Sequence, residues 1–424
     1  MSDIYFYKGS ENQMNDTDET TNLKSIQSEL AKVFDTKSLS FLLGSGCSSF
    51  YSEGKEVGIP TMKPMANEFY DSSKKGYSLT KDQIKYIKDD LCINIEEDSF
   101  KNNIERFLET LHSYNFYLKR AEIPEGKTTD ANVHYKHIDD DKKEIPKLIN
   151  QTRLFILKKC LNEDNKGMDN NLVSLYQLFY RKLLYRNPNL PKVNVFTTNY
   201  DLYSETALDN IGVLYANGFT GGVNKFFNPT IFNYAYAERM DLSQNKWNII
   251  DNFIYLYKIH GSINWIEDTT SSKLFTIKET QEVSFDRLKD EETIMIYPSP
   301  TKQNASLGSP YSDLFREFQK KLMQNNNVLI TMGYSFSDQH INNLIYQAFT
   351  IPSFRLIAFV EKENNENIQK LISLNDPRIW IIGGKMEDGN NLHYFNQIVD
   401  NLLPDLNNDE IDEKIENIVR KLLS

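Results

Sequence analysis

Two apolar stretches of this sequence end abruptly in polar residues, and they constrain the fold more than any other feature. Residues 193–201 (VNVFTTNYD) begin with β-branched and aromatic side chains and finish with Asn199 and Asp201, whereas residues 257–262 (YKIHGS) contain His260 near their end. Short apolar runs of this kind are typical of buried strands. Because ligands bind beyond the carboxyl ends of the strands in open α/β sheets, we expect these three polar side chains to meet in one crevice.

Two further strand-like runs end in turns that contain glycine. Residues 39–49 (LSFLLGSGCSS) carry the Gly-x-Gly turn Gly44-Ser-Gly46, and residues 327–338 (NVLITMGYSFSD) carry Gly333-Tyr-Ser335. Glycines at such a turn let the backbone approach a pyrophosphate, and the start of a following helix would offer free N–H groups to it. Each turn alone is also compatible with an ordinary strand-to-helix connection. Four strand-end motifs in this order are much more specific than one.

Together these motifs resemble the sirtuin family, and most closely the bacterial sirtuin-like proteins of antiphage defence, which hydrolyse NAD. The resemblance extends from about residue 39 to about residue 361 and leaves most of 65–190 unmatched. The motifs that carry it are Gly44-Ser-Gly-Cys-Ser48, Gly58-Ile-Pro60, Thr198-Asn-Tyr-Asp201, His260-Gly261 and Gly333-Tyr-Ser335.

Two departures from the sirtuin pattern affect the expected reaction. Deacetylating sirtuins continue Gly-Ile-Pro with Asp-Phe-Arg, but here Thr61-Met-Lys63 follows. They also carry a four-cysteine zinc module after the His-Gly motif, whereas the cysteines of this chain are Cys47, Cys92 and Cys160. A structural zinc site needs four ligands. We therefore expect no metal, and we expect cleavage of NAD itself in preference to protein deacylation.

A metal pair at His134 and His137 is the alternative to this expectation. Both residues lie in the charged run 121–145, which reads as a solvated excursion without further ligands of suitable geometry. We therefore expect no metal at this pair.

The resemblance and the chemistry of NAD cleavage imply a role for each site residue. Asn199 would position the ribose or the attacking water, and His260 would be the base, since histidine titrates near neutral pH. Asp201 would accept from the nicotinamide carboxamide or orient Asn199; taken alone, Asn199 and Asp201 could also be ordinary turn and helix-capping residues. The expected NAD-binding residues are Gly44, Ser45, Gly46 and Ser48 at the diphosphate, Glu361 at the adenosine ribose, and Ile59, Thr198, Gly333 and Ser335.

Alternation of strand-like and helix-like segments predicts an α/β fold with a doubly wound, Rossmann-like parallel sheet and a helical insertion. Further strands are expected at 212–215, 253–259, 293–297, 328–332, 356–360 and 380–382. The predicted organisation is a polar segment and helix at 1–38, an NAD-binding domain formed by 39–64 and 191–400, a helical insertion at 65–190, and a C-terminal helix at 401–424.

Composition restricts the partners and the compartment. With 48 basic and 59 acidic residues, the chain lacks the broad basic footprint of a nucleic-acid-binding protein. No apolar stretch is long enough to span a bilayer, the N-terminus does not resemble a signal peptide, and the few cysteines fit a reducing compartment. A cytoplasmic protein without direct nucleic-acid or membrane binding is expected.

The resulting functional hypothesis is an NAD glycohydrolase that depletes NAD during phage infection. The alternatives are an NAD-dependent protein deacylase and a non-catalytic subunit that binds ADP-ribose or another nucleotide. The resemblance also implies a homo-oligomer, with a HerA-type ATPase or an Argonaute-type protein as possible partners. The apolar side of the C-terminal helix would form an interface or pack on the protein's own sheet, and it consists of Ile411, Ile415, Ile418 and Leu422.

Overall fold

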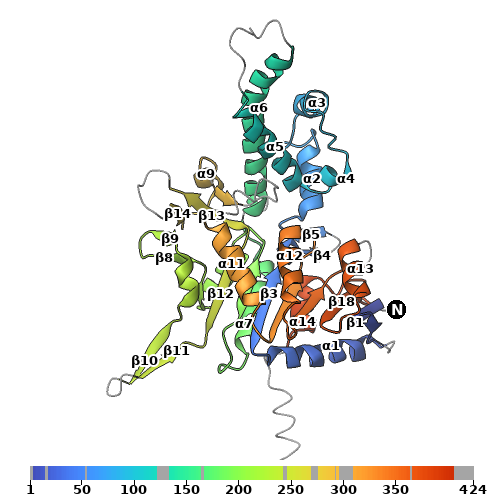
Figure 1. Cartoon of the computed structure of the whole chain (residues 1–424), viewed down its shortest axis with the longest axis vertical. Helices are drawn as coiled ribbons and strands as arrows, with labels where there is room; N and C mark the ends of the chain where they lie inside the picture. Colours follow the sequence, from blue (N-terminus) through green and yellow to red (C-terminus); the bar gives the residue numbers. More distant parts are fainter. Residues whose placement is uncertain are drawn as a thin grey trace, which may run out of the picture.

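A nine-stranded sheet forms the centre of the computed structural model (Figure 1). The strand order is β2 (Glu11–Asn12), β1 (Asp3–Lys8), β18 (Ile379–Lys385), β17 (Arg355–Phe359), β16 (Asn327–Met332), β3 (Ser38–Leu43), β6 (Asn194–Thr197), β12 (Phe253–Lys258) and β7 (Leu214–Ala216). The strands from β18 to β7 are parallel, and only β1 and β2 run antiparallel to their neighbours. The predicted Rossmann-like α/β fold is confirmed. The structure describes residues 3–14, 18–52, 55–121, 133–163, 167–241, 246–268, 276–291, 293–295, 309–362 and 365–404.

Both faces of the sheet are apolar, because alternate residues of each buried strand point to opposite sides. In β3, Phe41 belongs to one hydrophobic core and Leu42 to the other. Helices α1 (Glu19–Phe34), α7 (Asn170–Leu184), α8 (Tyr203–Asn210) and α14 (Phe395–Asn401) contribute to the first core. Helices α11 (Tyr311–Leu322), α12 (Gln339–Ala348) and α13 (Glu366–Ser373) contribute to the second. The sheet is therefore covered on both faces, as a doubly wound fold requires.

A group of helices rises from one end of the sheet (Figure 1), and we call residues 62–160 the helical block. It contains α2 (Met62–Tyr70), α3 (Lys81–Asp89), α4 (Asp98–Lys101), α5 (Ile104–Leu118) and α6 (Val133–Cys160). Thr80 and Gln83 form a capping box at the start of α3. Helix α7 instead packs on the sheet, where the rings of Phe179 and Phe41 lie 5.5 Å apart.

The charged run was expected to be a solvated excursion, and for the residues from 133 onward that expectation is wrong. These residues form the first half of α6, and Asp141 is buried at 4% exposure. Its two carboxylate oxygens accept hydrogen bonds from the hydroxyls of Tyr86 in α3 and Tyr114 in α5. A carboxylate can be buried when it is paired in this way, so the run joins three helices. Residues 122–132 lie outside the described part.

A second, antiparallel sheet combines strands from before and after the turn that carries His260. Its strands are β15 (Thr293–Met295), β13 (Gly261–Glu267), β14 (Ile277–Glu279), β9 (Lys225–Phe227) and β8 (Phe219–Thr220). The rings of Phe219, Phe227 and Trp265 contact one another in its core. The strand expected at 293–297 is therefore present as β15, but it belongs to this sheet. The hairpin of β10 (Ala237–Asp241) and β11 (Lys246–Ile249) projects away from it (Figure 1).

Some expectations fall outside the described residues. These are the C-terminal helix with Ile411, Ile415, Ile418 and Leu422, and the side chain of His134. Among the helices that the structure does describe, none combines the length and apolar character needed to cross a membrane.

Candidate active site

The loops after β3 and β16 pack against each other so closely that they require glycine. Gly44 N donates to Met332 O at 2.9 Å, and a Cβ on Gly44 would lie 2.3 Å from Gly333 O. Gly333 has a φ of +59°, and a Cβ there would lie 2.5 Å from the backbone nitrogen of Cys47. These glycines therefore permit backbone packing between two strand ends, in addition to any approach by a ligand.

The first glycine turn is not followed by an α-helix, contrary to expectation. Residues 45–47 form a single 3₁₀ turn, and the chain then enters the hairpin of β4 (Ser49–Ser52) and β5 (Lys55–Gly58). The next α-helix, α2, begins only at Met62. A pyrophosphate at this turn would therefore meet loop N–H groups, without the N-terminus of a long helix.

Asn199, Ser48 and Asp201 form a buried hydrogen-bond chain beyond the end of β6. Asn199 Nδ2 donates to Gly44 O at 2.9 Å and to Ser48 Oγ at 2.7 Å. Ser48 Oγ donates in turn to Asp201 Oδ2 at 2.5 Å, and Asp201 Oδ1 accepts from Tyr203 N at 3.1 Å. Asp201 is thus connected to Asn199 through Ser48, which is the contact that an orienting role for Asp201 would use. This arrangement also directs the Ser48 hydroxyl toward Asn199 and Asp201, whereas a phosphate contact was predicted.

The amide oxygen of Asn199 has no hydrogen-bond partner within the described residues, although the side chain is buried. Its orientation is determined by its neighbours, because the Gly44 carbonyl only accepts and must face Nδ2. A buried acceptor without a partner is costly and is usually reserved for a ligand or water. Asn199 Oδ1 is therefore available to a bound molecule.

A buried lysine holds the turn that follows Asn199. Lys258 is 1% exposed, and its Nζ donates to the carbonyls of Tyr200, at 3.3 Å, and Asp201. The same Nζ lies 3.1 Å from Glu205 Oε1. Burial raises the pKa of Glu205, and the charge of Lys258 opposes that effect. Lys258 was not among the predicted site residues, although it lies two positions before His260.

His260 lies in the two-residue turn between β12 and β13 and is 6% exposed. Its Nε2 lies 3.1 Å from Asp338 Oδ2, and the ring of Tyr200 flanks it with centroids 6.5 Å apart. Asp338 was also missed from the sequence. In the sequence, Asp338 is marked only by its position immediately before the apolar pattern of α12, and this position indicates a helix N-cap.

These residues surround a cavity of about 850 Å³ between the sheet and the helical block. The predicted site residues that line it are Ser45, Gly46, Ser48, Ile59, Thr198, Asn199, Asp201, His260, Gly333, Ser335 and Glu361. Gly44 contributes through its carbonyl contact with Asn199. Additional lining residues come from the helical block, namely Asp98, Asn103, Glu105, Arg106 and Glu109. A cavity of this volume falls within the usual range of small-molecule and cofactor pockets.

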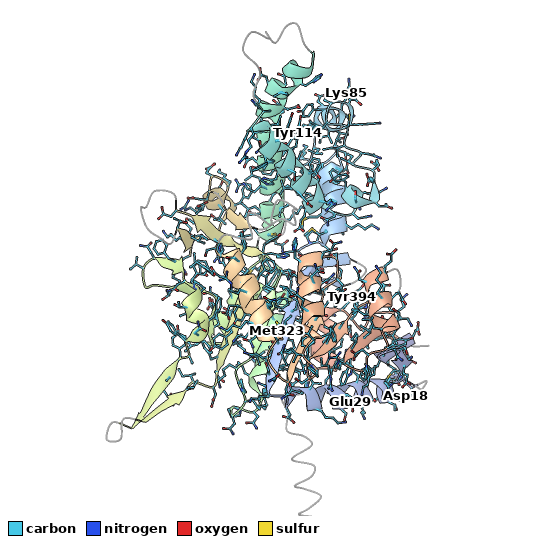
Figure 2. All side chains as sticks on the ribbon, viewed as in Figure 1. Asp18, Glu29, Lys85, Tyr114, Met323 and Tyr394 are labelled. Carbon is cyan, nitrogen blue, oxygen red and sulfur yellow. The ribbon has the colours of Figure 1, made fainter. Side chains whose placement is uncertain are left out.

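One side of the cavity is lined by residues that follow β17 and β18. Glu361 is exposed just after the end of β17, whereas His393 and Tyr394 follow β18. Burial lowers the pKa of His393 to about 4, and its Nδ1 has no partner in the part of the chain described. In Figure 2, Tyr394 lies between the helical block at the top and Glu29 of α1 below.

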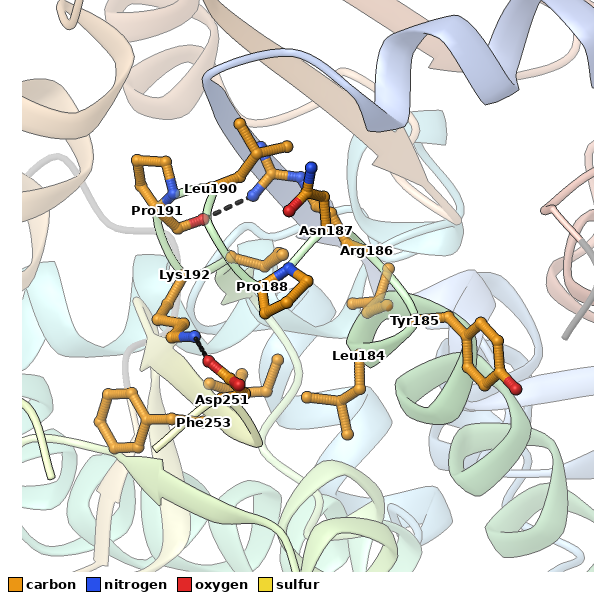
Figure 3. A pocket seen from close by; sticks show the side chains of 13 residues that line it. Leu184, Tyr185, Arg186, Asn187, Pro188, Leu190, Pro191, Lys192, Asp251 and Phe253 are labelled. Atoms are coloured by element: carbon orange, nitrogen blue, oxygen red, sulfur yellow. Dashed lines mark hydrogen bonds and ion pairs between the residues drawn. The ribbon is translucent and has the colours of Figure 1, made fainter. Parts of the chain in front are cut away.

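A second, smaller pocket of about 300 Å³ lies at the opposite ends of the strands (Figure 3). Val193 and Phe253, which line it, are found at the beginnings of β6 and β12. The Arg186 guanidinium there donates to the carbonyls of Phe34 and Pro191, among others. These hydrogen bonds connect segments of backbone at the amino ends of the strands. None of the predicted site residues lines this pocket, so the larger cavity is the candidate active site.

No group of three or more histidine, cysteine, aspartate or glutamate side chains within the described ranges has the arrangement of a metal site. His137 is exposed on α6, and the three cysteines are free thiols.

A search of curated proteins found no match to this chain. A family comparison matched residues 193–382, which run from just before β6 into β18. The matched range contains Asn199, Asp201 and His260, and the first glycine turn precedes it. The matching family is the SIR2-like domain, so this part of the chain supports membership of a sirtuin-like family, whose members are generally enzymes that use NAD.

Proposed function

We propose that the protein is an NAD glycohydrolase, which cleaves NAD with water to ADP-ribose and nicotinamide. The observation that carries the proposal is the combination of an available amide oxygen, Asn199 Oδ1, with His260 in one cavity. The SIR2-like domain at residues 193–382 supports the use of NAD.

The reaction breaks the bond between C1′ of the ribose and the nicotinamide nitrogen, and the electron pair leaves with nicotinamide. Water adds to C1′ and releases one proton, so the products are ADP-ribose, nicotinamide and a proton. Asn199 would hold the ribose or the water through Oδ1, and His260 would accept the proton. A positioned acceptor and a positioned base are the groups that this chemistry needs, because nicotinamide is already a good leaving group.

Hydrolysis is favoured over deacylation by the segment of chain after His260. Where deacetylating sirtuins carry a zinc module, this chain forms β13, β14 and β15, and Trp265 of β13 packs against Phe219 and Phe227 of the earlier strands β8 and β9. The cavity is bordered by the polar and charged side chains of α4 and α5, including Asp98 and Arg106. An assay that contains both NAD and an acyl-lysine peptide separates the two reactions, because only deacylation consumes the peptide.

The decisive test compares three alanine variants. Asn199→Ala and His260→Ala should each reduce nicotinamide release by about a hundredfold or more, which is the typical effect of losing a positioned catalytic group. His340→Ala is the matched control, because His340 is an exposed histidine near the same region. Nicotinamide and ADP-ribose are measured by chromatography, and thermal melting checks the fold. Near-normal turnover by a folded Asn199 or His260 variant would contradict the proposal.

We further propose, from the resemblance, that NAD depletion serves antiphage defence and is switched on by assembly or by a partner. A homo-oligomer, a HerA-type ATPase and an Argonaute-type protein are the partners to test. Light scattering and NAD turnover measured in one sample distinguish a gated assembly from a monomer that is active alone.

A further inference from the structure

The pairing of His260 with Asp338 joins two strand ends that are remote in the sequence. Asp338 Oδ2 lies 3.1 Å from His260 Nε2, and the two side chains are 13% and 8% exposed. Because both side chains are largely buried, solvent screens the contact between the carboxylate and the imidazole only weakly.

The orientation of the Asp338 carboxylate is held from its other oxygen. Asp338 is the N-cap of α12, and its Oδ1 accepts from His340 N at 2.9 Å and from Ile341 N at 3.3 Å. A capping carboxylate is anchored to the helix and interacts favourably with its N-terminal dipole. One oxygen therefore accepts hydrogen bonds from the start of the helix, and the other lies beside His260.

The loop that leads to Asp338 is held in an unusual conformation. Phe336 is fully buried and has a φ of +58°, a value that bulky residues rarely adopt. Its carbonyl accepts from Asn342 Nδ2 at 2.7 Å and from Asn367 Nδ2 at 2.8 Å. Strained backbone persists only where the surroundings enforce it, and here the result is a fixed Asp338.

We propose that Asp338 is a positioning residue that keeps a proton on His260 Nε2 and leaves Nδ1 as the basic nitrogen. The proposal rests on the proposed function in one respect, namely that His260 is the base. A neutral imidazole has one donor and one acceptor nitrogen, so a carboxylate next to Nε2 selects the tautomer. The same logic orients the histidine of catalytic triads.

Asp338→Asn tests the proposal because asparagine is also a good N-cap. Its amide oxygen would keep the α12 contacts and present the NH₂ group to Nε2, which must then become the acceptor. We expect the turnover number for NAD cleavage to fall by about a hundredfold or more, while KM changes by less than about threefold. In protein labelled with ¹⁵N-histidine, the two-bond spectrum should show the Nε2–H tautomer of His260 in the wild type and the Nδ1–H tautomer in the variant.

Two controls make the result interpretable. Asp169→Asn changes a matched capping residue, which accepts from Asn171 N and Leu172 N at the start of α7, and it should leave turnover and the His260 signal unchanged. His260→Gln identifies the His260 signal among the six histidines.

Unchanged turnover in Asp338→Asn, or the same tautomer in both proteins, would overturn the proposed role of Asp338. A tautomer switch in a protein whose wild type cleaves no NAD would support the pairing and refute the glycohydrolase instead. The two ideas can therefore fail separately.

Discussion

At the scale of single residues, burial without a partner marks both Asn199 and His393. The two differ in kind: Asn199 lacks a partner for its neutral amide oxygen, whereas His393 lacks one for a titratable nitrogen, within the residues that the structure describes. An amide oxygen does not titrate, so its capacity to accept a hydrogen bond from a ligand does not depend on pH. A buried imidazole instead couples the stability of the protein to pH, because its charged form is penalised by burial.

His393 should therefore make the protein less stable in acid. Its pKa in the folded protein is about 4, below the ordinary value of 6.5. Because the folded-state pKa is lowered, the stabilisation is complete above about pH 6.5 and is lost as the pH falls toward 4. This interval corresponds to about 3 kcal/mol. Urea unfolding at several pH values, without NAD, should show a smaller acid loss in His393→Gln; identical pH slopes would contradict the assignment.

Among the residues of the site, Asn199, Asp201 and His260 could be predicted because each stands where an apolar run ends. Asp338 and Lys258 could not be assigned in the same way. Asp338 resembles any helix cap until its second oxygen is seen beside His260, and Lys258 resembles the polar end of a strand until its burial against Glu205 is known. Their roles depend on distances between segments, which periodicity does not contain.

At the scale of elements, the contact between the loops after β3 and β16 determines the shape of the site. Gly333→Ala should lower the free energy of unfolding, because alanine meets both a left-handed φ and the Cys47 backbone. Gly212→Ala is the matched control, since Gly212 has a φ of +68° and a Cβ added there would meet no atom within 4 Å. We expect the Gly333 variant to lose about 1–3 kcal/mol more than the control in denaturant unfolding, the usual cost of overpacking. Equal losses of unfolding free energy in the two variants would show that the loops can move apart at little energetic cost.

The predictability of the elements follows the same physical logic. Strands β3, β6, β12, β16, β17 and β18 lie within mainly apolar, β-branched and aromatic segments, and such segments are typical of parallel strands buried on both faces. Strand β13 was missed because Ser262 and Asn264 interrupt the apolar pattern, although both are buried. The helix expected after the first glycine turn was wrong, since Gly58 and the β4–β5 hairpin occupy that part of the chain.

At the scale of the whole molecule, a buried hydrogen bond connects the helical block with the loop that carries Asn199. Tyr200 Oη donates to Glu105 Oε1 of α5 at 2.9 Å, and both side chains are buried. A partner that moved the helical block would therefore act on Tyr200, the neighbour of Asn199. We therefore propose this contact as the connection between the helical block and the site.

Tyr200→Phe should weaken that connection. We expect NAD turnover to fall about fivefold or more, the lower end of typical coupling between sites. Tyr86→Phe is the matched control, because it removes a tyrosine–carboxylate hydrogen bond to Asp141 within the helical block. It should reduce stability by about 1–2 kcal/mol and leave turnover unchanged. Equal turnover in the two variants, measured with thermal melting, would argue against a connection through Tyr200.

The position of β3 inside the sheet, between β16 and β6, has a consequence for biosynthesis. Ser40 of β3 pairs with Asn194 and Ser38 pairs with Asn327, so its two neighbours leave the ribosome long after it does. Pairing between such distant segments is slow and must await the later strands. A nascent chain that has not reached Asp338 cannot place a carboxylate beside His260. Translation itself thus delays the assembly of a site whose proposed reaction would consume the NAD of the cell that makes it.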